Sequence, residues 1–234
     1  MPADTPLSPP GWVPLALSVD IPPGTSAGTV CNGVEIVVWR DIAGAVHAWE
    51  DRCPHRGMKL SFGFVRGDRI ACLYHGWEYE GGGACRYIPS HPDLEVPSSI
   101  RVTRFRAIEA LGMIWVSPLD DAAPPPPPPE AGALMALRSL QVDAPVATLA
   151  DAFAAHGLPG TGPVGDVVQG AATIWLTQGG IQLCAGLQPV DAGASVLHLM
   201  VAGAVAPSAL AALVPATAAL RRIVEGGVVG GRDV

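Results

Sequence analysis

The stretches CPHRG (53–57) and CLYHGW (72–77) decide how this chain is read. Each holds one cysteine and one histidine, in the pattern Cys53-x-His55, sixteen further residues, Cys72-x-x-His75. Proline and glycine disfavour helix and regular strand, so we expect loops at both places. Two cysteines and two histidines on two tight loops predict a metal site.

Two other interpretations compete with a binuclear centre. The four could be ordinary core or surface residues, although four metal-binding side chains in two matched loops rarely coincide by chance. Structural zinc sites use the same residue types, and the four ligands alone do not distinguish the metals. Zinc fingers of this composition usually pair cysteine with cysteine and histidine with histidine, whereas each loop here holds one of each. That arrangement favours two metals, as in a 2Fe-2S cluster with both cysteines on one iron and both histidines on the other.

The two loops belong to a longer pattern that resembles the Rieske proteins, and more narrowly the Rieske non-haem iron oxygenases, which hydroxylate or demethylate aromatic and related substrates. The resemblance covers roughly residues 11–118 and rests on CPHRG, LSFGFVRGD (60–68), CLYHGWEYEGGGAC (72–85), YIPS (87–90) and GMIWVSP (112–118). It implies that Cys53 and Cys72 bind the inner iron of a 2Fe-2S cluster. It implies equally that His55 and His75 bind the outer iron, where electrons leave.

Two differences from the respiratory-chain Rieske proteins indicate which branch of the family this chain resembles. Respiratory-chain Rieske proteins carry an extra cysteine in each loop, joined as a disulfide, and a serine hydroxyl aimed at the cluster. The corresponding positions here are Met58, Tyr74 and Trp77. We therefore expect weak hydrogen bonding to the sulfurs and a midpoint potential near the lower end of the Rieske range, about −150 mV, as in the oxygenase branch. Trp77 is expected to shield the cluster from water, and Arg56 to help dock a reductase.

Composition excludes several classes of protein. The net charge is −7 and Lys59 is the only lysine, so the chain lacks the basic field that nucleic acid requires. The N-terminus, MPADTPLSPP, has neither a basic start nor an apolar run, so we expect no signal peptide or anchor and a cytoplasmic location. Five scattered cysteines argue against a disulfide framework. The three outside the metal pattern, Cys31, Cys85 and Cys184, are expected to be packed side chains.

Six consecutive prolines, Pro124–Pro129, predict a domain boundary because they form a stiff, extended segment. We expect a Rieske domain over 1–120, a proline-rich linker over 121–131 and a second domain over 132–234. The first is predicted to be all-β, since its short runs are rich in β-branched and aromatic residues and are separated by glycine, proline and aspartate. These runs are residues 34–40, 45–51, 69–75 and 112–118.

The second domain is predicted to be small and α+β. Strand patterns occur at 173–178, 181–190 and 195–203, and 208–225 reads as a helix with a possible kink at Pro215. Residues 131–220 contain only five charged side chains, so we expect this half to bind another chain, as a homo-oligomer or with oxygenase subunits. The uncharged segment 196–220 is long enough to span a bilayer. It contains His198 and two prolines, so we expect no membrane span.

The resemblance implies a second iron site, with two histidines and a carboxylate in a helix-grip domain. Its motif is an aspartate, a histidine three residues later and another histidine four or five residues after that. LADAFAAHG (149–157) is the nearest candidate: Asp151 would be the acid that bridges the two iron sites of neighbouring subunits, but Ala154 stands at the first histidine position. His156 and His198 are candidate ligands of a mononuclear Fe(II), neither at the expected spacing. The second domain is therefore expected to be a shortened helix-grip remnant.

Three functions follow as hypotheses. The favoured one is an oxidoreductase component of an oxygenase system that relays electrons from a reductase or ferredoxin toward mononuclear iron in a partner subunit. The second is a complete small monooxygenase or dioxygenase with an atypical iron site. The third is a non-catalytic assembly or regulatory subunit. A mononuclear iron would add a third iron per chain, which distinguishes the first two.

Overall fold

A computed structural model describes residues 11–117 and 133–229 of the chain. Their contacts form two compact units. The first is built mainly from Ser18–Glu109, and the second from residues 133–229 together with Trp12–Leu17 and Ala110–Met113. The predicted proline-rich linker (121–131) lies outside the described residues, so the predicted domain boundaries stay a prediction.

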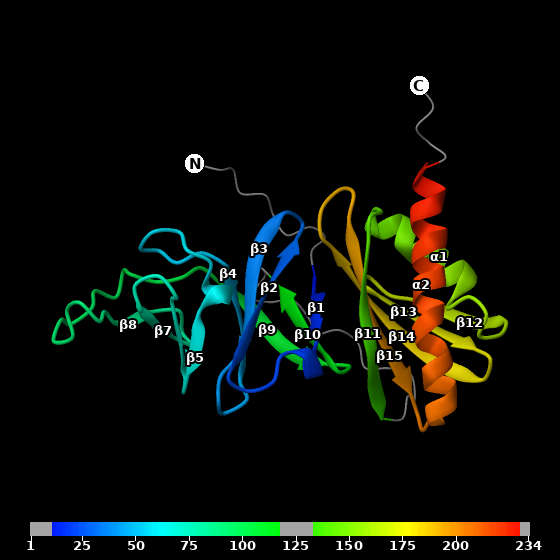
Figure 1. Ribbon diagram of the computed structural model, residues 1–234, viewed down its shortest axis with the longest axis horizontal. Coiled ribbons are helices and arrows are strands. Elements are labelled where there is room, and N and C mark those ends of the chain that lie inside the picture. Colours follow the sequence, from blue (N-terminus) through cyan, green and yellow to red (C-terminus); the bar gives the residue numbers. More distant parts are fainter. Residues whose placement is uncertain (1–10, 118–132, 230–234) are drawn as a thin grey trace. The chain divides into compact units, whose positions relative to one another are not determined.

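Two sheets carry the N-terminal part of the chain, which confirms its predicted all-β class (Figure 1). The larger has the strand order β1-β10-β9-β4-β3-β2, although β1 groups with the second unit by its contacts. Its strands are β1 (Val13–Leu17), β2 (Thr25–Cys31), β3 (Val34–Arg40), β4 (Val46–Glu50), β9 (Arg104–Ala110) and β10 (Met113–Ser117). The smaller is an antiparallel sheet of β5 (Phe64–Arg66), β6 (Arg69–Ala71), β7 (Glu78–Glu80) and β8 (Cys85–Tyr87). Two short 3-10 turns, η1 (Ser18–Asp20) and η2 (Leu60–Phe62), complete this part.

The core of the first unit holds in place the two loops that are predicted to bind metal. Side chains alternate between the two faces of a strand, and Trp39 on β3 and Trp49 on β4 share the inner face. They pack in one buried cluster with Tyr79 of β7 and with Cys53 and Cys72 from the loops. Burial of these large aromatic side chains supplies the main stabilisation, at roughly 25 cal/mol per Å² of apolar surface removed from water. The loops are therefore anchored by their cysteines.

The second unit is α+β, as predicted, with a five-stranded antiparallel sheet in the order β11-β15-β14-β13-β12. Its elements are β11 (Leu134–Val142), α1 (Val146–His156), β12 (Val164–Gln169), β13 (Thr173–Gln178), β14 (Ile181–Pro189), β15 (Ser195–Ala202) and α2 (Pro207–Val229). The sequence predicted β13, β14, β15 and α2 but not β11, α1 and β12. No helix in the described parts of the chain is long and apolar enough to cross a membrane.

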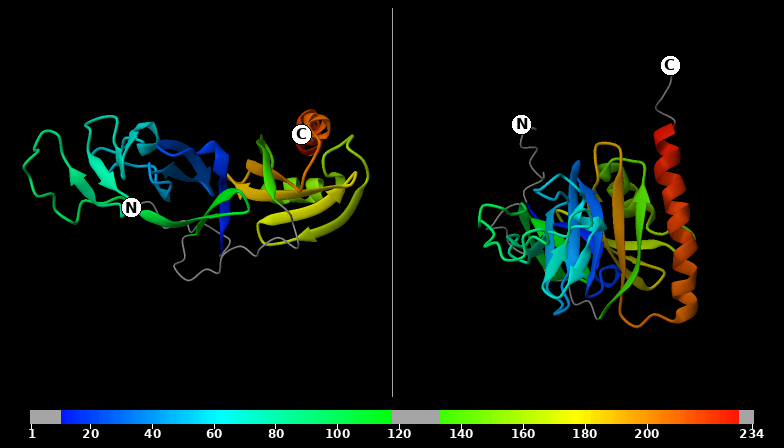
Figure 2. Two further views of the ribbon diagram at one scale, coloured as in Figure 1. Left: turned by 90° about the horizontal axis from the view of Figure 1, so that it is seen from below. Right: turned by 60° about the vertical axis from the view of Figure 1, so that its left-hand side comes forward.

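Both helices lie against one face of this sheet, and α2 is seen end-on in the left view of Figure 2. Leu149 and Phe153 of α1 and Leu220 of α2 are fully buried against alternate residues of β14 and β15. The helix α2 continues through Pro215, although proline has no N–H to donate to the preceding turn. The space between helices and sheet is thus filled by apolar side chains.

Candidate metal centre

The two cysteine loops have the same backbone hydrogen bonds, which explains their matching residue types. The N–H of Cys53 donates to the carbonyl of Met58 at 2.8 Å, and the N–H of Cys72 to that of Trp77 at 2.9 Å. In each loop a glycine four residues after the cysteine, Gly57 or Gly76, donates back to the cysteine carbonyl. Both glycines have positive φ, 74° and 70°, a conformation that residues with a Cβ rarely adopt. The sequence therefore builds two equivalent turns that present a cysteine at the same place.

The cysteine sulfurs form the inner, buried side of the site. Cys53 and Cys72 are each 3% exposed and interact with each other through their side chains. Burial raises the pKa of the Cys72 thiol, while hydrogen bonds from the backbone N–H groups of Tyr74 and His75 lower it. The hydroxyl of Tyr79 lies 3.1 Å from the Cys53 sulfur. These donors are placed to stabilise negative charge on sulfur, as metal-bound thiolates require.

The histidine rings form the outer side of the site. The ring centroids of His55 and His75 are 4.7 Å apart, and His55 is half-buried whereas His75 is exposed. Trp77 stacks on His55 with 4.2 Å between centroids and 4° between planes, and Tyr74 lies 3.8 Å from His75. Burial lowers the pKa of His55, and the nearby His75 and Arg56 add to this shift, so the neutral imidazole that binds metals is favoured. Trp77 thus lies against the histidine side of the site, and its expected role of shielding the cluster from water stays a prediction.

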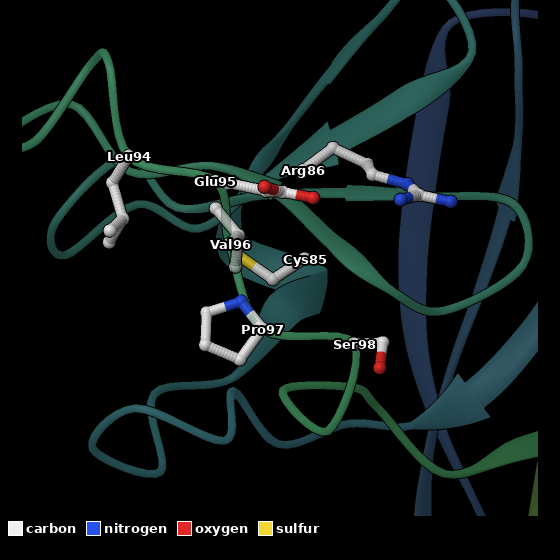
Figure 3. A pocket seen from close by; sticks show the side chains of 7 residues that line it. All are labelled: Cys85, Arg86, Leu94, Glu95, Val96, Pro97 and Ser98. Atoms are coloured by element: carbon white, nitrogen blue, oxygen red, sulfur yellow. The ribbon is translucent and has the colours of Figure 1, made fainter.

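The other cysteines are buried, as predicted. Cys85 lies on β8 with its Sγ 3.7 Å from the carbonyl of Tyr87. Figure 3 shows its sulfur beside Val96 and Pro97, at a cavity of about 430 Å³ that also borders Arg86. Burial raises the pKa of this thiol, which keeps it protonated and unreactive. Cys31 and Cys184 are buried too.

The side chains present suit a binuclear cluster. Two buried thiols touch each other on one side, and two imidazoles lie together at the surface, so the donors fall into a cysteine pair and a histidine pair. Each iron of a Rieske-type 2Fe-2S cluster takes one such pair. Among the residues that the structure describes, no three His, Cys, Asp or Glu side chains converge as they would on a single metal ion. The sequence reasoning missed Tyr79, which only the packing brings to Cys53.

The predicted bridging acid Asp151 and the two candidate iron ligands, His156 and His198, lie on two elements of the second unit, α1 and β15. Asp151 and His156 are exposed on α1, and Ala154 packs against the buried core. His198 is buried on β15, where Nδ1 lies 2.8 Å from the Ser139 hydroxyl and Nε2 lies 2.9 Å from the Gln188 amide oxygen. Burial lowers the pKa of His198 to about 4. Both ring nitrogens of His198 thus have a hydrogen-bond partner, Ser139 or Gln188. Its role as an iron ligand stays a prediction.

Comparison with known proteins identifies the class of this site. Residues 11–100 match the family described as the Rieske [2Fe-2S] domain, so this part of the chain is a Rieske domain, and such a domain implies a 2Fe-2S cluster. The sequence relatives of this domain and the solved structures of similar fold include Rieske non-haem iron oxygenases.

Individual relatives point the same way. Oxidoreductase NdmD of Pseudomonas putida is 41% identical over 122 residues, which are 47% of this chain and 21% of that protein. The 3-chlorobenzoate-3,4-dioxygenase oxygenase subunit of Comamonas testosteroni is 36% identical over 107 residues, or 45% of this chain and 25% of the subunit. The structure of apo dicamba monooxygenase superposes with a TM-score of 0.75 at 21% identity, covering 95% of this chain and 87% of that one. This last likeness shows a shared fold alone.

The chain spans about a fifth of the length of the first curated relatives that it matches. The oxygenase subunit of Comamonas testosteroni among these relatives supports a Rieske oxygenase-type role. The activity, the substrate and the partners of this chain are treated below as proposals.

Proposed function

We propose that this chain relays electrons in an oxygenase system, with a 2Fe-2S cluster held by Cys53 and Cys72 on one iron and by His55 and His75 on the other. The observation that carries the proposal is the division of donors between an inner cysteine pair and an outer histidine pair, with ring centroids 4.7 Å apart. When bound, the cluster supplies one-electron oxidation and reduction. A reductase or ferredoxin is the proposed donor, and mononuclear iron in a partner subunit the proposed acceptor.

The protein contributes the environment for this chemistry. Burial of Cys53 and Cys72 keeps water from the sulfurs, and the Tyr79 hydroxyl, 3.1 Å from the Cys53 sulfur, would donate to it once Cys53 is a metal-bound thiolate. The stacked ring of Trp77 supports the plane of His55, one of the two proposed outer ligands. His75 is exposed and thus gives a partner short access to the outer iron.

The second unit supports a relay more than an oxygenase. An iron held by two histidines and a carboxylate needs three convergent side chains. The first histidine position is occupied by Ala154, whose methyl group packs against the core, and His198 already has hydrogen bonds at both ring nitrogens. Asp151 is exposed on α1 and is proposed to meet the histidine edge of a neighbouring subunit.

Substitution of the ligands tests the cluster assignment. Cys53→Ser and Cys72→Ser, made separately, should abolish the visible absorption of the cluster and destabilise the first unit, because metal binding and loop folding are coupled. Cys85→Ser is the matched control, since it removes a buried thiol of the same unit that is not a proposed ligand. Retention of the normal spectrum in either ligand variant, or equal loss in the control, would overturn the assignment.

A small oxygenase is the second candidate, because the fold of dicamba monooxygenase extends over 95% of this chain. Iron analysis separates the two. The relay should contain two irons per chain, all lost when Cys53 and His55 are replaced together. If one iron remains in that variant and disappears on His156→Ala or His198→Ala, the small-oxygenase proposal replaces the relay.

A further inference from the structure

The two cysteine loops are closed at their ends in different ways. The second loop, 72–77, lies between β6 and β7, whose antiparallel pairing includes Ala71↔Glu78, the residues on either side of the loop. A strand pair therefore holds the ends of that loop together. The first loop, 53–58, lies between β4 and η2. In the described parts of the chain β4 pairs with β3 and β9, so no strand pair joins the two ends of this loop.

A buried carboxylate joins the ends of the first loop instead. Asp51 precedes Cys53 by two residues and is 3% exposed. Its Oδ1 accepts a hydrogen bond from the backbone N–H of Ser61 at 2.7 Å, and its Oδ2 accepts one from the Ser61 hydroxyl at 2.6 Å. The backbone N–H of Asp51 donates to the carbonyl of Glu35 on β3 at 2.9 Å, so the acid is itself held by the sheet. Both carboxylate oxygens are thus bound to one residue on the far side of the loop.

The strand β2 leaves room for this pair of side chains. A Cβ at Gly28 on β2 would lie 2.8 Å from the Ser61 hydroxyl and 3.1 Å from Oδ2 of Asp51, so a larger residue would displace one of them. The hydroxyl of Ser26, also on β2, donates to the carbonyl of Ser61 at 3.3 Å. Three segments therefore meet at the contact between Asp51 and Ser61: β2, the residue after β4, and η2.

A second contact across the first loop is weaker. Nζ of Lys59 lies 2.5 Å from Oε1 of Glu35, but the two side chains are 40% and 51% exposed. Ion pairs between exposed side chains contribute little to stability, because water screens them and both side chains lose conformational freedom. A buried carboxylate with two hydrogen bonds contributes more, since bonds to a charged group are stronger than bonds between neutral groups. The contact between Asp51 and Ser61 is therefore the main side-chain connection between the two ends of this loop.

We propose that Asp51 is a positioning residue for the cluster, which acts through Ser61 to hold the first loop, with its two ligands, opposite the second loop. The backbone hydrogen bonds inside the first loop set its shape, whereas Asp51 sets its place on the sheet. Residues that orient metal ligands in this way affect how firmly a metal centre is held. The inference rests on the proposed function, since it concerns the same four cluster ligands.

The rate at which a chelator removes the cluster tests this role in the purified, cluster-containing full chain, followed by visible absorption without denaturant. Asp51→Ala removes both hydrogen bonds, so this variant should lose its cluster at least about tenfold faster than the parent. Asp51→Asn should lose it at close to the parent rate, because the amide can accept from the N–H and donate to the hydroxyl oxygen. The electron paramagnetic resonance signal of the reduced cluster should change in Asp51→Ala and return toward that of the parent in Asp51→Asn.

Asp41→Ala is the matched control, because Asp41 is also a buried carboxylate of the first unit and accepts a backbone N–H, that of Ala45, at 2.8 Å. Asp41 lies in the turn between β3 and β4, at the opposite end of β4 from Asp51, so its variant should lose the cluster at the parent rate. If Asp51→Ala does not fold, Ser61→Ala decides alone. It removes only the hydroxyl bond and should lose the cluster faster than both the parent and the control.

The positioning role is overturned if Asp51→Ala or Ser61→Ala keeps its cluster as long as the parent does. It is also overturned if the Asp41→Ala control loses the cluster as fast as these variants, or if Asp51→Asn loses it as fast as Asp51→Ala. A parent chain that binds no 2Fe-2S cluster would instead overturn the proposed function, and this inference with it.

Discussion

Removing the Tyr79 hydroxyl should lower the midpoint potential of the cluster. The hydroxyl lies 3.1 Å from the Cys53 sulfur, and both groups are buried. With Cys53 bound to iron as a thiolate, Tyr79 can only donate in this pair. The donated bond stabilises the reduced cluster more than the oxidised one, because the reduced form carries one more negative charge. Tyr79→Phe removes this bond and leaves the aromatic packing.

The size of the shift follows from the energy of such a bond. A hydrogen bond to a charged group contributes about 1.5–3 kcal/mol, and only its difference between the two redox states affects the potential. A difference of about 1 kcal/mol corresponds to about 40 mV for one electron, since a tenfold change in equilibrium constant is about 59 mV. The expected potential of Tyr79→Phe is therefore lower than that of the parent by about 40 mV.

Anaerobic redox titration followed by electron paramagnetic resonance measures this shift. Tyr87→Phe is the control, because Tyr87 lies on the neighbouring strand β8, where it pairs with Glu78. The reasoning is refuted if Tyr79→Phe keeps its cluster and its potential is unchanged, or if the control falls by the same amount. The parent potential also tests the sequence-based value of about −150 mV, which assumed weak hydrogen bonding to sulfur; Tyr79 should move it upward.

Three further expectations concern stability and association. Burial lowers the pKa of His198 from 6.5 to about 4 in the folded chain, so between these pH values only the unfolded state binds the proton. The free energy of unfolding in urea should therefore fall by about 2 kcal/mol from pH 7 to pH 5. The His198→Asn variant should not show this fall. The same pH dependence of the free energy of unfolding in the parent and in His198→Asn would contradict this. Gly76→Ala should destabilise the first unit by more than Gly67→Ala in thermal melts: both residues have positive φ, but only at Gly76 would a Cβ meet Pro89, at 2.9 Å. Equal losses would show that the contact with Pro89 has no effect. The second unit should self-associate, since Val168 on β12 is 56% exposed in a half with few charges, and a stable monomer in light scattering at high concentration would argue against this.

The amino-acid sequence by itself determined the class of this protein. Neighbouring proline and glycine predicted that Cys53, His55, Cys72 and His75 lie in two loops, because these residues restrict the backbone locally. The residue types and their spacing predicted the metal site, because metal ligands must be of a few residue types. Strands such as β3 were predictable for the same reason, since β-branched and aromatic residues specify extended backbone over a short range. The resemblance to Rieske oxygenases followed from these local patterns.

Only the tertiary structure decided which distant side chains meet. Tyr79 lies 26 residues from Cys53, and Ser139 lies 59 residues from His198, so their contacts depend on strand pairing that no local pattern encodes. The helix α1 was missed because its alanine-rich sequence has weak periodicity, and it is held by burial of Leu149 and Phe153 against the sheet.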